Sequence, residues 1–192
     1  RAPIARAHVV SDCRPEPDGG SMTEQLIPLE DARRRQSETA PLILDPRDPL
    51  RTARMFIEAR FMVDTYPTLH HHRGSFYQWN GTAYAEITDD DVRTMLWELL
   101  EVALVSAKEE LRPFQPTPAK VSNVYDALKA AAHLSQDYET PCWLELTPDL
   151  PPEEILPCAN GLLHLPERKL LPASPLFFCH HALDYPYDPH VP

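Results

Sequence analysis

The stretch His70–Thr88 (HHHRGSFYQWNGTAYAEIT) constrains the fold most, because its pattern is that of a β-hairpin. The dipeptide Asn80-Gly81 lies between two runs rich in aromatic residues. It favours a two-residue type I′ turn, which needs positive φ at both central positions. Such a turn predicts two cross-strand pairs, Trp79 with Thr82 and Tyr77 with Tyr84.

This register places three aromatic rings on one face of the hairpin and three other apolar side chains on the opposite face. An exposed face of rings can stack on nucleic acid bases, at about 1–3 kcal/mol per base. A two-stranded ribbon is only marginally stable alone, so we expect most of the rings to be buried. The first face holds Tyr77, Trp79 and Tyr84, and the second holds Phe76, Ala85 and Ile87.

The chain has 192 residues and a formal net charge of -11, with 22 prolines and only 5 glycines. This length suggests one domain with a tail, and the prolines predict few, short helices. The acidity argues against a protein that grips nucleic acid over its whole surface, because Lys and Arg must neutralise phosphates. A local basic patch is compatible with it.

The sequence has no run of 18 or more apolar residues and no apolar signal-peptide core at its start. We therefore expect a cytoplasmic protein with no membrane contact. No CxxC pair is present, which favours reduced structural thiols. The four cysteines are Cys13, Cys142, Cys158 and Cys179.

Residues 1–40 are rich in Pro, Ser, Arg and acidic residues and lack a sustained apolar period, which predicts a disordered tail. The chain starts with Arg, and Met22 is a candidate natural start, which would make residues 1–21 upstream sequence. A basic run at residues 33–35 solubilises the tail or touches DNA, and we favour the first interpretation. Ordered structure is expected from Pro41 onward.

Apolar residues at helical spacing predict three helices. The first spans Pro49–Met62 after the N-cap Asp48, the second Asp90–Leu111, and the third runs from Thr117-Pro118 to near Leu134. The acidic triplet at 89–91 is typical of a helix start and not of a metal site. The apolar stripes are Leu50, Ala53, Ile57 and Phe61; Val92, Leu96, Leu99, Ala103 and Ala107; and Val121, Val124, Tyr125, Leu128 and Ala132.

Arg47, Arg51 and Arg54 align on the opposite side of the first helix, which makes them the best candidates for contacts to DNA phosphates. Lys120, on the third helix, is a further DNA-binding candidate. A solvated helix face explains both patterns equally, and we favour that interpretation.

The last third of the chain predicts a second hairpin. Residues 136–157 are irregular, with Trp143 and Leu144 expected in the core. The runs Gly161–Leu165 and Leu170–Pro172 flank a turn-like tetrapeptide, and Pro172 places its strand at a sheet edge. Residues 174–189 are aromatic and proline-rich, which indicates an extended segment packed on a neighbouring element.

No pattern in the sequence nominates an active site or a metal site. The loops GxxxxGK[ST] and GxSxG and the motif HExxH are absent. His70, His71 and His72 lack a nearby carboxylate or cysteine, and the spacing of Cys158, Cys179, His180 and His181 matches no short zinc finger. We therefore expect no metal and no catalytic residue in this chain.

Three stretches of the sequence, taken in their order along the chain, resemble the domain that precedes the ATPase in phage and plasmid primase-helicases. These are helicases of the superfamily 3 type, which is also found in the poxvirus primase-helicase. The resemblance covers Leu42–Pro192, with Ala173 where that family often has His. The stretches are Phe76-Tyr77-Gln78-Trp79-Asn80-Gly81 with Tyr84; Lys120-Val121-Ser122-Asn123-Val124 with Ala127-Leu128; and Asn160-Gly161-Leu162-Leu163 with Ser174-Pro175, Phe177-Phe178, Tyr185, Tyr187, Asp188 and Pro189.

The resemblance implies a non-catalytic module of a DNA replication machine in a bacterial host cell. It implies that the module helps a helicase ring assemble or load onto DNA, that DNA is bound through the parent protein, and that the full-length protein is a homo-oligomeric ring. ATP and Mg²⁺ are implied only for an ATPase that follows, so no cofactor is expected in this chain.

Two other interpretations stay open. One is a stand-alone DNA-binding or regulatory module that uses the three arginines and the exposed rings. The weaker one is a metal-dependent enzyme built on His70, His72 and the late Cys/His cluster. In every case the pattern predicts an α+β fold, a small mixed domain of three helices and two β-hairpins after a disordered tail.

Overall fold

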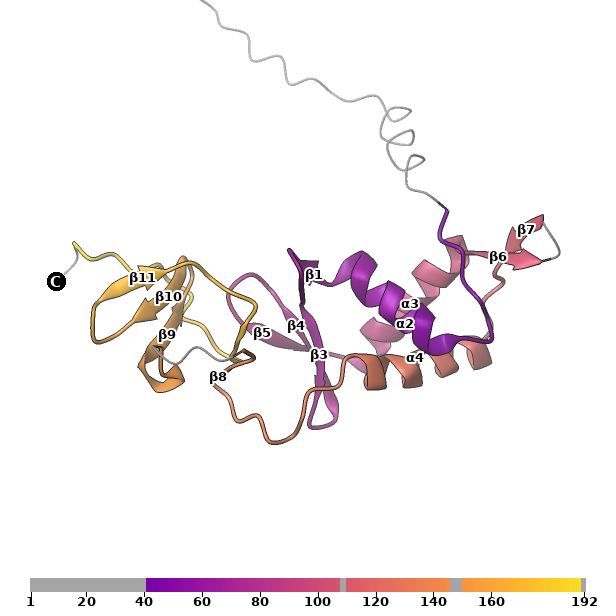
Figure 1. Cartoon of the computed structure of the whole chain (residues 1–192). Coiled ribbons are helices and arrows are strands. Elements are labelled where there is room, and N and C mark those ends of the chain that lie inside the picture. Colours follow the sequence, from indigo (N-terminus) through magenta and orange to yellow (C-terminus); the bar gives the residue numbers. More distant parts are fainter. Residues whose placement is uncertain (1–40, 108–109, 146–149, 191–192) are drawn as a thin grey trace, which may run out of the picture. The chain divides into compact units, whose positions relative to one another are not determined.

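The structure, a computed structural model, describes residues 41–107, 110–145 and 150–190. The predicted tail, with Met22 and the basic run at 33–35, lies outside these residues. The described part is α+β, with three α-helices and several small antiparallel sheets, which confirms the predicted fold class (Figure 1).

Helices α2 (Pro49–Arg60), α3 (Asp89–Val102) and α4 (Pro118–Ala131) surround the larger of two apolar cores, and α4 packs on both of the other helices (Figure 1). All three predicted helices are therefore present. The largest fully buried side chains of this core are Phe56, Leu69, Phe76, Leu96, Leu100, Tyr125 and Leu128.

Side chains cap all three helix starts, and of these caps Asp48 was predicted. Asp48 accepts a hydrogen bond from the backbone N–H of Arg51 at 3.0 Å, and Thr88 forms a capping box with Asp91. Thr117 caps α4. Leu50 does not follow the predicted apolar stripe, because its side chain is 37% exposed. The buried face of α2 runs instead through Thr52, Ala53, Phe56 and Ile57.

The prediction that the second helix reaches Leu111 is wrong. The chain turns extended at Ala103, and β6 (Leu104–Ala107) pairs antiparallel with β7 (Glu110–Pro113). Leu104 is held in this conformation because it exchanges backbone hydrogen bonds with the segment at 42–44. A buried Ala103 and a partly buried Val105 fit a strand as well as a helix, so the apolar pattern alone could not separate them.

Helix α4 also ends before the predicted Leu134. His71 donates its backbone N–H to the carbonyl of Ala132 at 2.7 Å and accepts from the N–H of Leu134 at 2.9 Å. This parallel bridge to the first sheet competes with the helical hydrogen bonds and ends the helix at Ala131.

The first sheet has three strands in the order β3 (Leu69–His72), β4 (Ser75–Trp79) and β5 (Tyr84–Ile87). A short ribbon of β1 (Met62–Val63) and β2 (Tyr66–Pro67) precedes it. The predicted hairpin is thus β4–β5, and β3 joins β4 through a second tight turn (Figure 1).

The predicted hairpin register is wrong by two residues. Trp79 pairs with Tyr84, and Tyr77 with Glu86, because Asn80 does not adopt positive φ. Its side-chain Oδ1 instead accepts hydrogen bonds from two backbone N–H groups of a four-residue loop. A two-residue shift preserves the faces of a strand, so Tyr77, Trp79 and Tyr84 still share one face.

Two consecutive positive φ angles occur in the other turn, at Arg73 (48°) and Gly74 (95°). These residues connect His72 to Ser75 directly. The two-residue turn that the sequence suggested for Asn80-Gly81 therefore lies one strand earlier.

The C-terminal part holds two further sheets and the smaller core. Strand β8 (Cys142–Trp143) pairs with β12 (Phe177–Phe178), while β9 (Ile155–Cys158), β10 (Gly161–His164) and β11 (Lys169–Leu171) follow the short helix η1 (Pro152–Glu154). Strands β10 and β11 are the predicted second hairpin, with Pro172 directly after the edge strand. The smaller core contains Ala83, Ile155, Leu162, Phe177 and Cys179.

Within the described ranges, none of the helices is long and apolar enough to cross a membrane.

Candidate functional site

The residues that carry the family resemblance hold distant segments together. Tyr84 is fully buried, and its hydroxyl donates a 2.7 Å hydrogen bond to the carbonyl of Pro175. Its backbone N–H bonds to the carbonyl of Cys179. Tyr77 stacks on His180 at 4.4 Å between ring centroids. The hairpin is thereby fixed to the C-terminal segment by both ring packing and hydrogen bonds.

Asn160, in the third of the stretches that carry the resemblance, also joins distant parts of the chain. The amide of Asn160 donates to the carbonyl of Tyr187 at 3.0 Å and accepts from its N–H at 2.9 Å. Gly161 has φ of 147°, and a Cβ there would lie 2.3 Å from the carbonyl oxygen of Leu171. Only glycine fits this position.

The remaining candidate residues of these stretches pack in the core, lie in turns or form local hydrogen bonds. Phe76 and Val121 lie in the larger core, and Gly81 has φ of 108° in the hairpin loop. Ser174 accepts a hydrogen bond from the N–H of Leu176, and Asp188 accepts one from the N–H of His190. Trp79 is half-buried beside Tyr84. Of the three rings expected to serve the core, Tyr84 is buried, whereas Tyr77 and Trp79 are only half-buried.

Three histidines surround Phe178, which β12 inserts under the first sheet. The ring centroids of His70, His72 and His180 lie 5.9, 5.5 and 5.2 Å from that of Phe178. Each imidazole has one buried ring nitrogen without a hydrogen-bond partner. Burial, followed by repulsion from His72, lowers the pKa of His70 to about 4, partly offset by a hydrogen bond to Pro67.

These histidines and the late cysteines do not gather into a metal site. No group of three or more His, Cys, Asp or Glu side chains in the described ranges is placed to hold a metal ion. Burial raises the pKa of Cys179 to about 11 and raises that of Cys158, so both thiols are poorly ionised at neutral pH.

The three candidate arginines are exposed on and beside α2. Arg47, Arg51 and Arg54 make no ion pair and no side-chain hydrogen bond within the part of the chain that the structure describes. Other basic side chains are engaged: Arg60 with Glu98, Arg73 with the carbonyl of Gln136, Arg112 with Glu110, and Arg93 and Lys129 with the ring of Tyr125.

Lys120, the fourth DNA-binding candidate, is also engaged. Its ammonium donates to the carbonyls of Phe114 and Gln115 at 2.8 and 2.9 Å and lies over the ring of Phe114. These bonds tie the loop before α4 to the helix. A contact of Lys120 to phosphate would have to compete with them.

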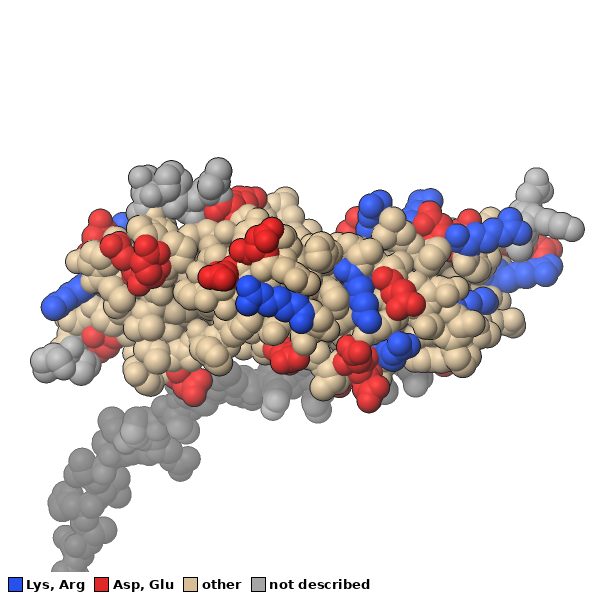
Figure 2. Space-filling view, turned by 90° about the horizontal axis from the view of Figure 1, so that it is seen from below, with Lys and Arg blue, Asp and Glu red and all other residues tan. Residues whose placement is uncertain are grey.

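One face of the molecule carries a mixed charge. On the face that Figure 2 shows, Lys and Arg side chains are interspersed with Asp and Glu, and no continuous basic track crosses it. This mixture agrees with the formal net charge of -11.

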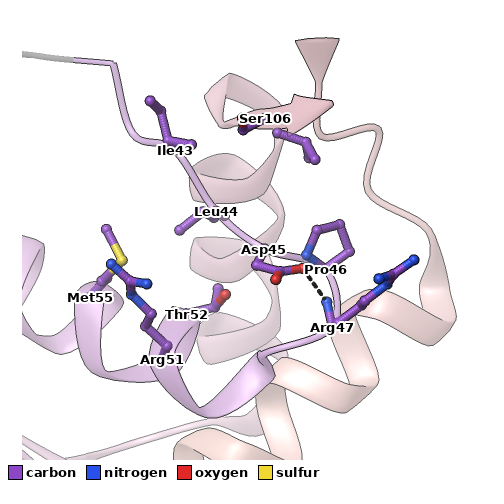
Figure 3. A pocket seen from close by; sticks show the side chains of 10 residues that line it. Ile43, Leu44, Asp45, Pro46, Arg47, Arg51, Thr52, Met55 and Ser106 are labelled. Atoms are coloured by element: carbon purple, nitrogen blue, oxygen red, sulfur yellow. Dashed lines mark hydrogen bonds between the residues drawn. The ribbon is translucent and has the colours of Figure 1, made fainter. Parts of the chain in front are cut away.

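A pocket of about 720 Å³ lies beside the start of α2. Arg51 and Met55 line one side and Arg47 the other, with Ile43 and Ser106 at the remaining edge (Figure 3). Arg54 does not line it. The residues around the pocket are Ile43, Leu44, Asp45, Pro46, Arg47, Arg51, Thr52, Met55, Val105 and Ser106.

Sequence reasoning found Arg47 and Arg51 but not this pocket. One wall of the pocket is formed by β6. Because residues 104–107 were predicted to be helical, their contact with residues 42–44 was not expected. The apolar pair Ile43-Leu44 directly before Asp45-Pro46 was the available signal for a short strand there.

The described residues thus define a small α+β domain whose signature side chains join a hairpin to a C-terminal segment, with one arginine-lined pocket on its helical part. A family model described as D5 N terminal like matches residues 59–192. The chain belongs to this family, whose domain is found N-terminal to the ATPase region of primase-helicases in phage and viral proteins. No curated protein matches the chain.

Proposed function

We propose that this chain is a non-catalytic accessory domain of a phage or plasmid DNA replication primase-helicase. It helps an ATP-driven helicase, which follows C-terminally in the parent protein, to assemble as a ring or to load onto DNA. The observation that carries the proposal is the family match over residues 59–192. The packing roles of Tyr84, Asn160 and Gly161 support it, since these family residues join distant segments of the module and each has a structural role.

In this role the domain works in the cytoplasm of a bacterial host and binds no cofactor of its own. ATP and Mg²⁺ belong to the ATPase, and DNA is bound through the parent protein. The full-length protein is a homo-oligomeric ring, so the partners of this domain are neighbouring copies and the replication machinery.

The parent gene provides a direct test. We expect it to encode a GxxxxGK[ST] loop within about 100 residues after Pro192, because that loop binds the phosphates of ATP. Sequencing the region downstream decides this. A stop codon directly after Pro192 would contradict the proposal that a helicase follows in the same chain.

A second candidate function is direct DNA binding by this module through Arg47, Arg51 and Arg54. It is favoured by the absence of any ion pair at these three side chains among the described residues. We then expect salt-sensitive, micromolar affinity for DNA that is lost in Arg51→Ala and in Arg54→Ala. Binding that is absent, or that survives both substitutions, would remove this candidate.

A further inference from the structure

The pocket beside α2 combines an apolar lining, two guanidinium groups and the main chain of Ile43, and none of these polar groups has a partner among the described residues. We propose that it docks an extended acidic segment of a partner protein, which places an apolar side chain in the pocket and carboxylates on Arg47 and Arg51. The inference rests on the geometry of the pocket and does not depend on the replication role, since most of the lining precedes residues 59–192.

The apolar part of the pocket suits an anchoring side chain. Leu44 is buried, Met55 and Val105 are partly buried against the larger core, and Ile43 is 44% exposed. These side chains are held by the core and by the bridge of Ile43 to Leu104, so the surface is preformed. A volume of about 720 Å³ is in the range of ligand pockets and accommodates a large aliphatic or aromatic side chain.

The charged part selects for carboxylates. Arg47 and Arg51 lie at opposite sides of the pocket with no ion pair inside the described ranges (Figure 3). A guanidinium binds a carboxylate through two parallel hydrogen bonds. The lining carboxylate of Asp45 forms no ion pair with either guanidinium among the described residues, and its Oδ1 accepts the backbone N–H of Arg47 at 2.9 Å.

The main chain of Ile43 offers a place to add a strand. In the parallel bridge, Leu104 bonds to the carbonyl of Leu42 and to the N–H of Leu44. The N–H and carbonyl of Ile43 itself therefore point to the other edge, where no partner is present among the residues that the structure describes. An extended peptide can bond to such an edge while its side chains enter neighbouring pockets.

A peptide fits these features better than single-stranded DNA does. Bases bind proteins mainly by stacking on aromatic rings, and none of the described residues that line this pocket is aromatic. The pocket instead offers aliphatic and thioether groups, which suit an apolar amino-acid side chain.

Fluorescence anisotropy tests the proposal with the full chain and a labelled peptide in which aspartate alternates with leucine. We expect binding that weakens at least about tenfold in Arg47→Ala and in Arg51→Ala, since each loses a charge-assisted hydrogen-bonded pair. Ile43→Ser should also weaken binding, because it removes part of the apolar lining. Arg51→Lys keeps the positive charge but loses the paired N–H donors of the guanidinium, so it should weaken binding in part. It also serves as the folding control if Arg51→Ala fails to fold.

Arg54→Ala is the matched control, because this arginine lies on the same helix but outside the pocket. We expect it to change peptide affinity by no more than about twofold, as for one exposed charge. Three results would overturn the proposal: equal affinity for a peptide with asparagine in place of aspartate, an equal loss in Arg54→Ala, or a single-stranded oligonucleotide that binds through the same residues and displaces the peptide.

Discussion

At the scale of single residues, two glycines with positive φ differ in what surrounds them. A Cβ at Gly161 would meet the carbonyl oxygen of Leu171 at 2.3 Å, whereas a Cβ at Gly74 would meet nothing within 4 Å. An alanine at position 74 would therefore cause backbone strain alone. An alanine at position 161 would cause backbone strain and also a steric clash with the main chain.

We predict that Gly161→Ala lowers the free energy of unfolding by about 3 kcal/mol, since β10 and β11 must separate to admit the methyl group. Gly74→Ala should cost only about 1 kcal/mol. Urea unfolding followed by circular dichroism measures both. Equal losses in the two variants would show that the close approach to Leu171 has no energetic importance.

Tyr84 donates a side-chain hydrogen bond that joins the first sheet to the Ser-Pro segment. We predict that Tyr84→Phe costs about 1–2 kcal/mol, because the buried carbonyl of Pro175 loses its donor while the ring remains. The control is Tyr185→Phe, since Tyr185 is 63% exposed. Thermal unfolding would contradict this role if both variants matched the parent chain.

The buried imidazole of His70 makes stability depend on pH. Its pKa in the folded chain, about 4, lies below the ordinary value of 6.5, so the folded state resists protonation. The contribution of His70 to the free energy of unfolding should be constant above pH 7 and should be lost as the pH drops from 6.5 toward 4, by up to roughly 3 kcal/mol. His70→Phe should reduce that slope in urea titrations at several pH values, and an unchanged slope would refute the assignment.

At the scale of elements, α3 depends on its cap. Thr88 and Asp91 exchange hydrogen bonds across the first turn. We predict that Thr88→Ala lowers the free energy of unfolding by about 1 kcal/mol. Ser122→Ala, inside α4, should be neutral or slightly stabilising, since alanine is the better helix former. The same urea experiment compares them, and a neutral Thr88→Ala would mean that the cap is not limiting.

Helix starts could be predicted from the sequence, and helix ends could not. The starts are encoded locally by Asp48-Pro49, by Thr88 with Asp91 and by Thr117-Pro118. The ends of α3 and α4 are set by backbone contacts from distant segments, at Leu104 and at His71. Such contacts leave no local pattern, and this is why the second helix was predicted nine residues too long.

In the hairpin, too, one feature could be predicted from the local sequence and another could not. Alternation assigned Tyr77, Trp79 and Tyr84 to one face correctly, because the face depends only on the parity of the register. The pairing itself depends on the turn, and the side chain of Asn80 stabilises a longer loop than the dipeptide suggested. The free arginines were visible in the sequence, but their pocket depends on strand β6.

At the scale of the whole molecule, the family residues and the arginine pocket lie in different parts of the domain. The family residues fix the hairpin to the C-terminal segment, which would lead toward the proposed ATPase. The arginine pocket lies on the helical part and largely precedes the matched residues. If both proposals hold, the part that carries the family residues serves the helicase ring and the helical part binds the acidic segment.

The role of this domain in ring assembly can be tested by the mass of the parent protein in solution, measured by sedimentation velocity with ATP and Mg²⁺. We predict a ring-sized species for the parent protein and smaller species for its ATPase region alone, with ring formation restored by the version that includes residues 41–192. Rings of equal mass and stability from the ATPase region alone would contradict a role of this domain in assembly.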